Sequence, residues 1–318
     1  METLATLEQA AQVIYRHMQP TLQYAWPLLG ARAGAEVWVK HENHTPIGAF
    51  KLRGGLLYLD DLRHRAPQTA GVVCATRGNH GQSVAFAARA HGLRAVIVVP
   101  HGNSADKNRS MRALGAELIE HGHDFDAALA HAREVAKARG LPMMPSYDPV
   151  LVRGVATYGL ELFRAAPDLQ AVYVPIGLGS GICGTIAARD ALGLRAEVVG
   201  VVAERAAAYS LSFAARKPVA TNSADTMADG VAVRVPDPAA LKVILKGCAR
   251  VVTVGEDEIK AAMRAYFADT HNVAEGAGAA ALAALLQERG KMAGKKVGLI
   301  LSGGNVDTAV YRDVLAAT

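Results

Sequence analysis

Short runs of apolar, mostly β-branched residues recur along the chain and are separated by longer alanine-rich stretches. The runs lie at residues 37–40, 72–74, 95–99, 171–176, 197–202, 251–254 and 297–301. In the stretches between them, apolar residues return at helical spacing, as Ile259, Met263 and Phe267 do. Short apolar strands that alternate with helices are typical of a parallel sheet covered on both faces. The pattern therefore predicts an α/β protein.

The predicted strands fall into two groups. One group lies at about residues 71–144 and is expected to contain strand, helix, strand, helix and helix; the other begins near Ala171. Pro142, Pro145 and Pro149 punctuate the crossover between the groups and suit a hinge. A chain of 318 residues is long enough for about two domains.

Composition and charge exclude several classes of protein. Hydrophobic residues make up 51% of the chain and charged residues 20%, which excludes a mainly disordered protein. The 34 basic residues barely exceed the 29 acidic ones and are scattered, so we expect no nucleic-acid partner. Cys74, Cys183 and Cys248 are isolated thiols, and no apolar run reaches the length of a membrane span. The N-terminal segment does not have the pattern of a signal peptide, so we expect a cytoplasmic protein without a membrane partner.

Three loops that follow predicted strands combine glycine with polar side chains. In doubly wound folds, ligands bind at such loops, which lie at the carboxyl ends of the strands. Residues 177–181 fit either a phosphate cradle or a tight strand-to-helix turn, and they lack the Rossmann and Walker spacings. Residues 76–83 suit a small anion such as a carboxylate, or an elaborate N-cap. Residues 301–307 are weaker evidence for a binding loop by themselves, because Asn and Asp after paired glycines also form ordinary turns.

A fourth segment, residues 41–55, places Lys51 beside Gly48, Ala49 and Phe50. Most lysines are surface residues, but small neighbours and an aromatic face favour a partly desolvated lysine at this position. Such a lysine has a lowered pKa and can act as a Schiff-base nucleophile.

By residue type alone, His121, His123, Asp124 and Asp126 could bind a metal ion. Gly122 and the helix that follows favour a solvated N-cap instead, and no metal site is expected.

In this order the four segments resemble the fold-type II pyridoxal-phosphate enzymes, specifically the threonine/serine dehydratase and serine racemase group. The family's lysine motif, a Glu followed by Gly-Ser-Phe-Lys-x-Arg-Gly, is matched by Glu42 and residues 48–54. Its Ser-x-Gly-Asn-His motif, its glycine loop and its Ser-Gly-Gly-Asn motif are matched by residues 76–80, 177–181 and 302–305. Further similarity lies at residues 228–231 and 254–259, so the resemblance covers nearly the whole chain.

The resemblance implies two open, mostly parallel twisted sheets flanked by helices, with the active site between two domains. The large domain would consist of residues 1–50 and 146–318, and a small inserted domain of residues 51–145. A homodimer is implied as well.

The cofactor implied by the resemblance is pyridoxal 5'-phosphate. Lys51 would hold it as a Schiff base, Phe50 would pack on the pyridine ring, and Asn79 would bind the phenolic oxygen. Ser302 would face the pyridine nitrogen, Glu275 would lie near the cofactor, and the glycine loop would bind the phosphate. The residues implied to bind the cofactor are thus Lys51, Phe50, Asn79, Gly177, Leu178, Gly179, Ser180, Gly181, Glu275 and Ser302.

The implied reaction is the dehydration of a β-hydroxy amino acid to a 2-oxo acid and ammonia, with Lys51 as the catalytic residue that moves the Cα proton. Threonine, serine, threo-3-hydroxyaspartate and phenylserine are candidate substrates. The residues implied to bind the substrate are Thr76, Arg77, Gly78, Asn79, His80 and Gly230.

Three departures from the family pattern keep alternatives open. The loop Gly-Leu-Gly-Ser-Gly replaces the dehydratases' four glycines and resembles the cysteine-synthase branch, which catalyses β-replacement. Arg77 stands where racemases have a serine, which disfavours an amino acid racemase because arginine rarely shuttles protons. The family's metal site would need an acid at Ser210; Glu204 matches and Ser210 does not, so no metal is assigned.

Overall fold

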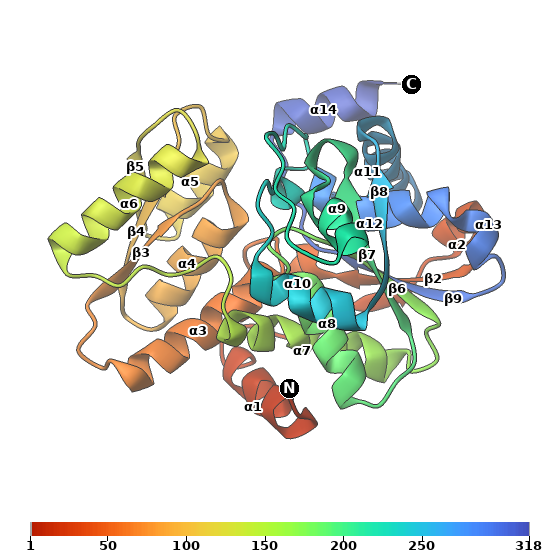
Figure 1. The fold of residues 1–318 in the computed structure, drawn as a ribbon, viewed down its shortest axis with the longest axis horizontal. Helices are drawn as coiled ribbons and strands as arrows, with labels where there is room; N and C mark the ends of the chain where they lie inside the picture. The colour runs from red at the N-terminus through yellow and green to blue at the C-terminus, as the bar shows by residue number, and fades with distance from the viewer. Residues whose placement is uncertain (1, 318) are drawn as a thin grey trace.

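The chain folds into two lobes, each built on its own sheet (Figure 1). The computed structural model describes residues 2–317. The small lobe contains a parallel sheet of three strands, β3 (Gly71–Ala75), β4 (Arg94–Val99) and β5 (Glu117–Glu120). The large lobe contains a sheet of six strands in the order β1-β2-β9-β6-β7-β8. Their bounds are β1 Gln23–Ala25, β2 Glu36–His41, β6 Ala171–Pro175, β7 Glu197–Ala203, β8 Cys248–Val254 and β9 Lys296–Leu301.

Helices cover both sheets. Those of the small lobe are α4 (Asn79–Ala90), α5 (Ala105–Ala113) and α6 (Phe125–Arg139). Two long helices, α3 (Lys51–Arg65) and α7 (Pro149–Ala165), lie where the lobes meet (Figure 1). The remaining helices are α1 Leu4–Ile14, α2 Pro27–Ala33, α8 Ser180–Ala191, α9 Ala208–Ala215, α10 Pro238–Gly247, α11 Glu256–Thr270, α12 Gly276–Gln287, α13 Arg289–Met292 and α14 Thr308–Ala316.

The large sheet is buried on both faces, which explains its continuous apolar strands. In β7, Val199 and Val201 pack into a cluster with α11 and α12, whereas Val198 and Val202 pack on the opposite face with α7 and α8. Successive side chains of a strand point to opposite faces, so a strand between two helical layers needs an apolar residue at every position. The fold class predicted from the sequence, α/β with two mostly parallel sheets, is confirmed.

Three of the predicted ligand loops emerge from one edge of the large sheet. Strands β2, β9 and β6 are adjacent and parallel, so their carboxyl ends lie side by side. After them come residues 42–50, residues 302–307 and residues 177–179, respectively. The fourth loop, residues 76–78, follows β3 of the small sheet. The topology thus brings together four segments that are far apart in the sequence.

The sequence-based prediction was wrong in two places. It omitted β5, whose Leu118 and Ile119 are flanked by two glutamates at the edge of the small sheet. It also omitted β1, a strand of only three residues that pairs antiparallel with β2. The helical spacing of Ile259, Met263 and Phe267 is confirmed by α11, in which the first two are buried and Phe267, near the C-terminal end, is 42% exposed. Edge strands and helix ends lie partly in solvent, so hydrophobic periodicity marks them poorly.

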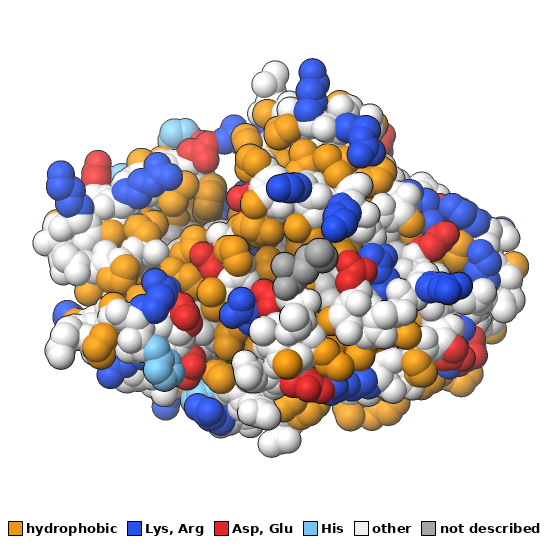
Figure 2. All heavy atoms as spheres, turned by 60° about the horizontal axis from the view of Figure 1, so that its bottom comes forward, with side chains coloured by type: hydrophobic (Ala, Val, Ile, Leu, Met, Phe, Trp, Pro, Cys, Tyr) orange, Lys and Arg blue, Asp and Glu red, His pale blue; other side chains and the backbone are white. Residues whose placement is uncertain are grey.

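The face shown in Figure 2 carries acidic and basic side chains interspersed with apolar ones, without a large patch of one charge. This distribution agrees with the scattered basic residues of the sequence. Within residues 2–317, no helix is both long and apolar enough to cross a membrane.

Candidate active site

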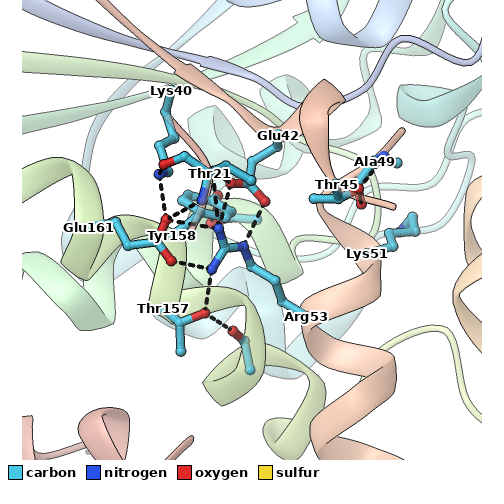
Figure 3. Close-up of polar contacts among 12 residues, drawn as sticks. Thr21, Lys40, Glu42, Thr45, Ala49, Lys51, Arg53, Thr157, Tyr158 and Glu161 are labelled. Atoms are coloured by element: carbon cyan, nitrogen blue, oxygen red, sulfur yellow. Dashed lines mark hydrogen bonds and ion pairs between the residues drawn. The ribbon is translucent and has the colours of Figure 1, made fainter. Parts of the chain in front are cut away.

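Lys51 begins helix α3 and is fixed by the loop that precedes it (Figure 3). The Thr45 hydroxyl donates to the carbonyl of Ala49 at 2.8 Å and accepts from its N–H at 2.9 Å. The N–H of Phe50 donates to the carbonyl of Ser302 at 3.0 Å, and Ala49 forms an antiparallel bridge with Gly303. The loops after β2 and β9 are therefore bound to each other at the lysine.

The ammonium of Lys51 lies in a poorly solvated place. Its Nζ is 5.1 Å from the centroid of the Phe50 ring, and it has no hydrogen-bond or ion-pair partner among residues 2–317. Burial lowers the pKa of Lys51, and the nearby Glu275 carboxylate opposes this shift. A lysine with a lowered pKa supplies the neutral amine that Schiff-base chemistry requires.

Residues 177–181 form a cradle of N–H groups at the start of α8. Tyrosine hydroxyls occupy two carbonyls of the loop: Tyr209 donates to Leu178 and Tyr158 to Gly181, both at 2.7 Å. The loop N–H groups make no hydrogen bond to any other described residue. A Cβ atom at Gly177 would approach the carbonyl oxygen of Gly230 to 2.5 Å, and Gly179 has a φ of +108°. Of the two interpretations of this loop, unpaired N–H groups at a helix N-terminus favour the anion site.

The loop at residues 76–80 is shaped by one hydroxyl. Thr76 Oγ1 accepts from the N–H groups of Gly78 and Gly81 at 3.0 and 3.2 Å. His80 is buried, and desolvation, aided by the Lys51 charge, lowers its pKa to about 3, so its imidazole stays neutral. Arg77 is exposed and has no partner among residues 2–317.

Asn79 joins the small lobe to two loops of the large lobe. Its Nδ2 donates to Glu275 Oε1 at 2.7 Å, and its Oδ1 accepts from Asn305 Nδ2 at 2.8 Å. Glu275 is buried, and Oε2 of this carboxyl has no hydrogen-bond partner among the described residues. Desolvation raises the pKa of Glu275 to about 7, a shift that the Lys107 charge opposes. A carboxyl that titrates near neutral pH is typical of an active site.

The structure also brings in residues that the sequence analysis did not assign to the site. Lys107 of α5 is buried, and its Nζ contacts Asp229 Oδ2 and lies 3.8 Å from Glu275 Oε2. Its aliphatic stem passes over Gly78, where a Cβ would come within 2.4 Å of Lys107 Cδ. A single lysine in a surface-like helix pattern gives no sequence signal for this role. Asp229 lies in a segment that matches the family, but its contact with Lys107 forms only because the two lobes meet.

A buried ion cluster supports the lysine helix (Figure 3). Arg53, two residues after Lys51, is fully buried; it donates to Glu42 through Nε and Nη2, and its Nη1 donates to Glu161 at 2.6 Å. Lys40 Nζ contacts Glu161 at 2.5 Å. Two cations thus face two carboxylates, which raises the pKa of Arg53 and lowers that of Glu161. The cluster ties α3 to β2 and α7.

The residues considered for metal binding do not form a metal site. The Asp124 side chain accepts from the N–H of Ala127 at 2.9 Å and caps α6, so the predicted N-cap is confirmed. Thr253 donates to the Ser210 hydroxyl at 3.3 Å, and Glu204 is exposed. Among residues 2–317, no three His, Cys, Asp or Glu side chains are grouped to hold an ion.

Comparison with known proteins agrees with this geometry. A family model described as "Pyridoxal-phosphate dependent enzyme" matches residues 14–303. The L-threonine ammonia-lyase of Thermotoga maritima is 33% identical over 308 residues, which are 96% of this chain and 76% of that protein. The structure of threonine deaminase isoform 2 of Solanum lycopersicum has a TM-score of 0.91 at 30% identity, covering 100% of this chain and 95% of that one. A pyridoxal 5'-phosphate-dependent aspartate racemase structure has a TM-score of 0.91 at 31% identity, with 96% and 97% covered.

The chain therefore belongs to the pyridoxal-phosphate dependent enzymes. Within that family it falls in the threonine dehydratase and serine racemase group, and the predicted pyridoxal-phosphate-dependent dehydratase is confirmed. The residues present fit the cofactor. Among residues 2–317, the Nζ of Lys51 and the N–H groups of the glycine loop have no hydrogen-bond partner, and there is no room for a side chain at Gly177.

Proposed function

We propose that this enzyme eliminates water from a β-hydroxy amino acid of the threonine or serine type, giving a 2-oxo acid and ammonia. The observation that carries the proposal is the position of Lys51, which is half-buried where the loops after β2 and β9 meet and whose Nζ has no hydrogen-bond or ion-pair partner among residues 2–317. The relatives named L-threonine ammonia-lyase and threonine deaminase support the substrate class.

Each site residue has a chemical task in this proposal. The N–H groups of residues 177–181 would bind the cofactor phosphate at the positive end of α8, and Ser302 would hold the pyridine ring at its nitrogen. Phe50 would pack on the ring, and the Asn79 amide would bind the phenolic oxygen. When bound, pyridoxal phosphate supplies the electron sink that makes the substrate Cα–H bond acidic.

The reacting groups of the substrate meet residues of both lobes. The N-terminus of α4, with Thr76 and His80, holds the substrate carboxylate. The Lys51 amine takes the Cα proton, and it can do so because burial keeps its pKa low. Gly230 lies beside the glycine loop and has no room for a side chain, because a Cβ at this position would come within 2.8 Å of the Cβ of Ala277.

The domain division belongs to the same proposal: residues 1–50 and 146–318 form the large domain and residues 51–145 the small one. Support comes from the two separate sheets and from two buried clusters, one made only of large-domain residues and one only of small-domain residues. We also propose a cytoplasmic homodimer, as the family resemblance implies.

The proposed chemistry is tested on the purified protein with pyridoxal phosphate. We expect a visible absorption band that borohydride abolishes, with the cofactor then found on a peptide that contains Lys51. The Lys51→Ala variant should bind no cofactor covalently. A panel of β-hydroxy amino acids, in both enantiomers and diastereomers, is then scored for oxo acid and ammonia, and O-acetylserine with sulfide is included as the β-replacement reaction. If product forms only from O-acetylserine with sulfide, and from no β-hydroxy amino acid, the dehydratase proposal is overturned.

A further inference from the structure

Two cations, Lys107 and Lys51, act on the charge of Glu275, and the Nζ of Lys107 lies 3.8 Å from Glu275 Oε2. Lys107 extends from the first turn of α5, and its side chain is 7% exposed. Its two acidic partners, Asp229 and Glu275, belong to the large lobe. Any separation of the lobes would therefore remove the positive charge from both carboxylates.

The side-chain amides of Asn305 and Asn79 lie next to Glu275 and form a chain of hydrogen bonds in which each donor is fixed. Asn305 Nδ2 donates to the carbonyl of Ile47 at 2.8 Å, and a carbonyl oxygen can only accept. The same Nδ2 group donates to Asn79 Oδ1, so the NH₂ group of Asn79 must face Glu275 Oε1. Glu275 has to accept this bond, and a carboxylate accepts better than a protonated carboxyl. The second N–H of Asn79 is then left as a donor for the cofactor.

We propose that Lys107 is a positioning residue: when the lobes meet, it keeps the Glu275 carboxyl charged and thereby holds the Asn79 amide as a donor toward the cofactor. The inference rests on the proposed cofactor site. It does not depend on which amino acid is the substrate.

The charges around Glu275 come from three segments. Lys107 on α5 and Lys51 on α3 stabilise its charged form, whereas Asp229 of the large lobe and burial destabilise it. The charge of Asp307, which follows β9, raises the pKa of Lys107 and so favours its charged form. Removing Lys107 and removing the charge of Asp229 should therefore have opposite effects on Glu275, although both changes break the same ion pair.

The titration of Glu275 is measured in the holoenzyme by NMR, with glutamate labelled with ¹³C at the side-chain carboxyl carbon. Glu275→Gln identifies the signal by its loss. An opposite charge within about 4–6 Å shifts a carboxyl pKa by about one to three units. We expect Lys107→Met to raise the Glu275 midpoint by about one unit or more, Asp229→Asn to lower it, and Lys107→Arg to keep it near the wild-type value. The exposed Lys137 of α6 provides the control, and Lys137→Met should leave the midpoint unchanged.

If Lys107 served only to hold the two lobes together through its ion pair, the result would be different. Lys107→Met and Asp229→Asn would then both destabilise the protein, and the Glu275 midpoint would stay unchanged or move in the same direction in both. Either outcome overturns the proposal. If Lys107→Met does not fold, an Asp229→Asn midpoint that fails to fall has the same consequence. Because the titration requires no turnover, a substrate panel without activity would overturn the proposed function and leave this result standing.

Discussion

Arg53 and Glu42 form a two-pronged ion pair inside the protein, with Nε and Nη2 of the guanidinium donating to the two carboxylate oxygens at 2.7 and 2.9 Å. Both side chains are fully buried. Arg53 lies half a turn beyond Lys51 on α3, whereas Glu42 follows β2, the strand that leads to the lysine loop. The pair therefore fixes the helix that carries the reactive lysine against the sheet.

Removing Arg53 from its buried cluster with Glu42, Glu161 and Lys40 should lower the free energy of unfolding. Arg53→Met leaves Glu42 and Glu161 facing Lys40 alone, and breaking a buried pair in this way costs about 3–5 kcal/mol. The free energy of unfolding of the apoprotein in urea measures the loss.

The double variant Arg53→Met with Glu42→Leu keeps the cluster neutral and should recover part of the lost unfolding free energy. Arg65→Met removes an exposed pair on the same helix and should cost at most about 0.5 kcal/mol. Similar losses for Arg53→Met and Arg65→Met would contradict this account.

Gly177 should tolerate no side chain. In the Gly177→Ala variant, the new Cβ would lie 2.5 Å from the carbonyl oxygen of Gly230, and both groups are backbone-anchored, so the phosphate loop must shift. We expect at least a roughly tenfold weaker affinity for pyridoxal phosphate, which corresponds to about 1.4 kcal/mol. The affinity is measured by titrating the apoenzyme and following absorbance.

Gly290→Ala is the matched control, because a Cβ at this position in α13 meets no atom within 4 Å. It should bind the cofactor like the wild type. Equal affinities of the Gly177→Ala variant and this control would show that the loop does not hold the phosphate.

The sequence could predict the four ligand loops because each one follows an apolar strand directly and contains glycine where the backbone comes close to other groups. It could also single out Lys51 from its small and aromatic neighbours, whereas the role of Asn79 was implied only by the family resemblance; each begins the helix that follows its loop. Lys107, Glu161 and Tyr158 could not be predicted. Each lies in a helix whose local pattern is ordinary, and each acquires its role only when α5 or α7 packs against a distant loop. Tertiary contacts of this kind leave no periodicity and no local motif.

His80 should make the folded protein sensitive to acid. Burial lowers its pKa to about 3, whereas an unfolded histidine titrates near 6.5, so between these values only the unfolded chain takes up the proton. The stability contributed by the neutral imidazole is therefore present above about pH 6.5 and is lost as the pH falls toward 3, by about 1.4 kcal/mol per pH unit. The difference in unfolding free energy between wild type and His80→Gln should shrink accordingly in urea titrations from pH 6.5 to 4.

The control for His80 is His123→Gln, because the His123 side chain is 90% exposed. Its difference from the wild type should stay constant over the same pH range. If the His80→Gln curve runs parallel to that of the wild type, the imidazole is not excluded from protonation in the folded state.

Arg77 should influence which substrate the enzyme prefers. It lies in the loop at residues 76–80, exposed and without a partner among residues 2–317, so its guanidinium is available to a second carboxylate or another polar β-substituent of the substrate. We expect Arg77→Ala to lower kcat/KM for threo-3-hydroxyaspartate at least about tenfold relative to that for threonine, since a charge-assisted hydrogen bond contributes about 1.5–3 kcal/mol. Steady-state assays of oxo-acid release on both substrates give this ratio. Arg89→Ala, an exposed change in the last turn of α4, the helix that follows this loop, should leave the ratio unaltered. An unchanged ranking of substrates in Arg77→Ala would mean that the guanidinium does not reach the substrate.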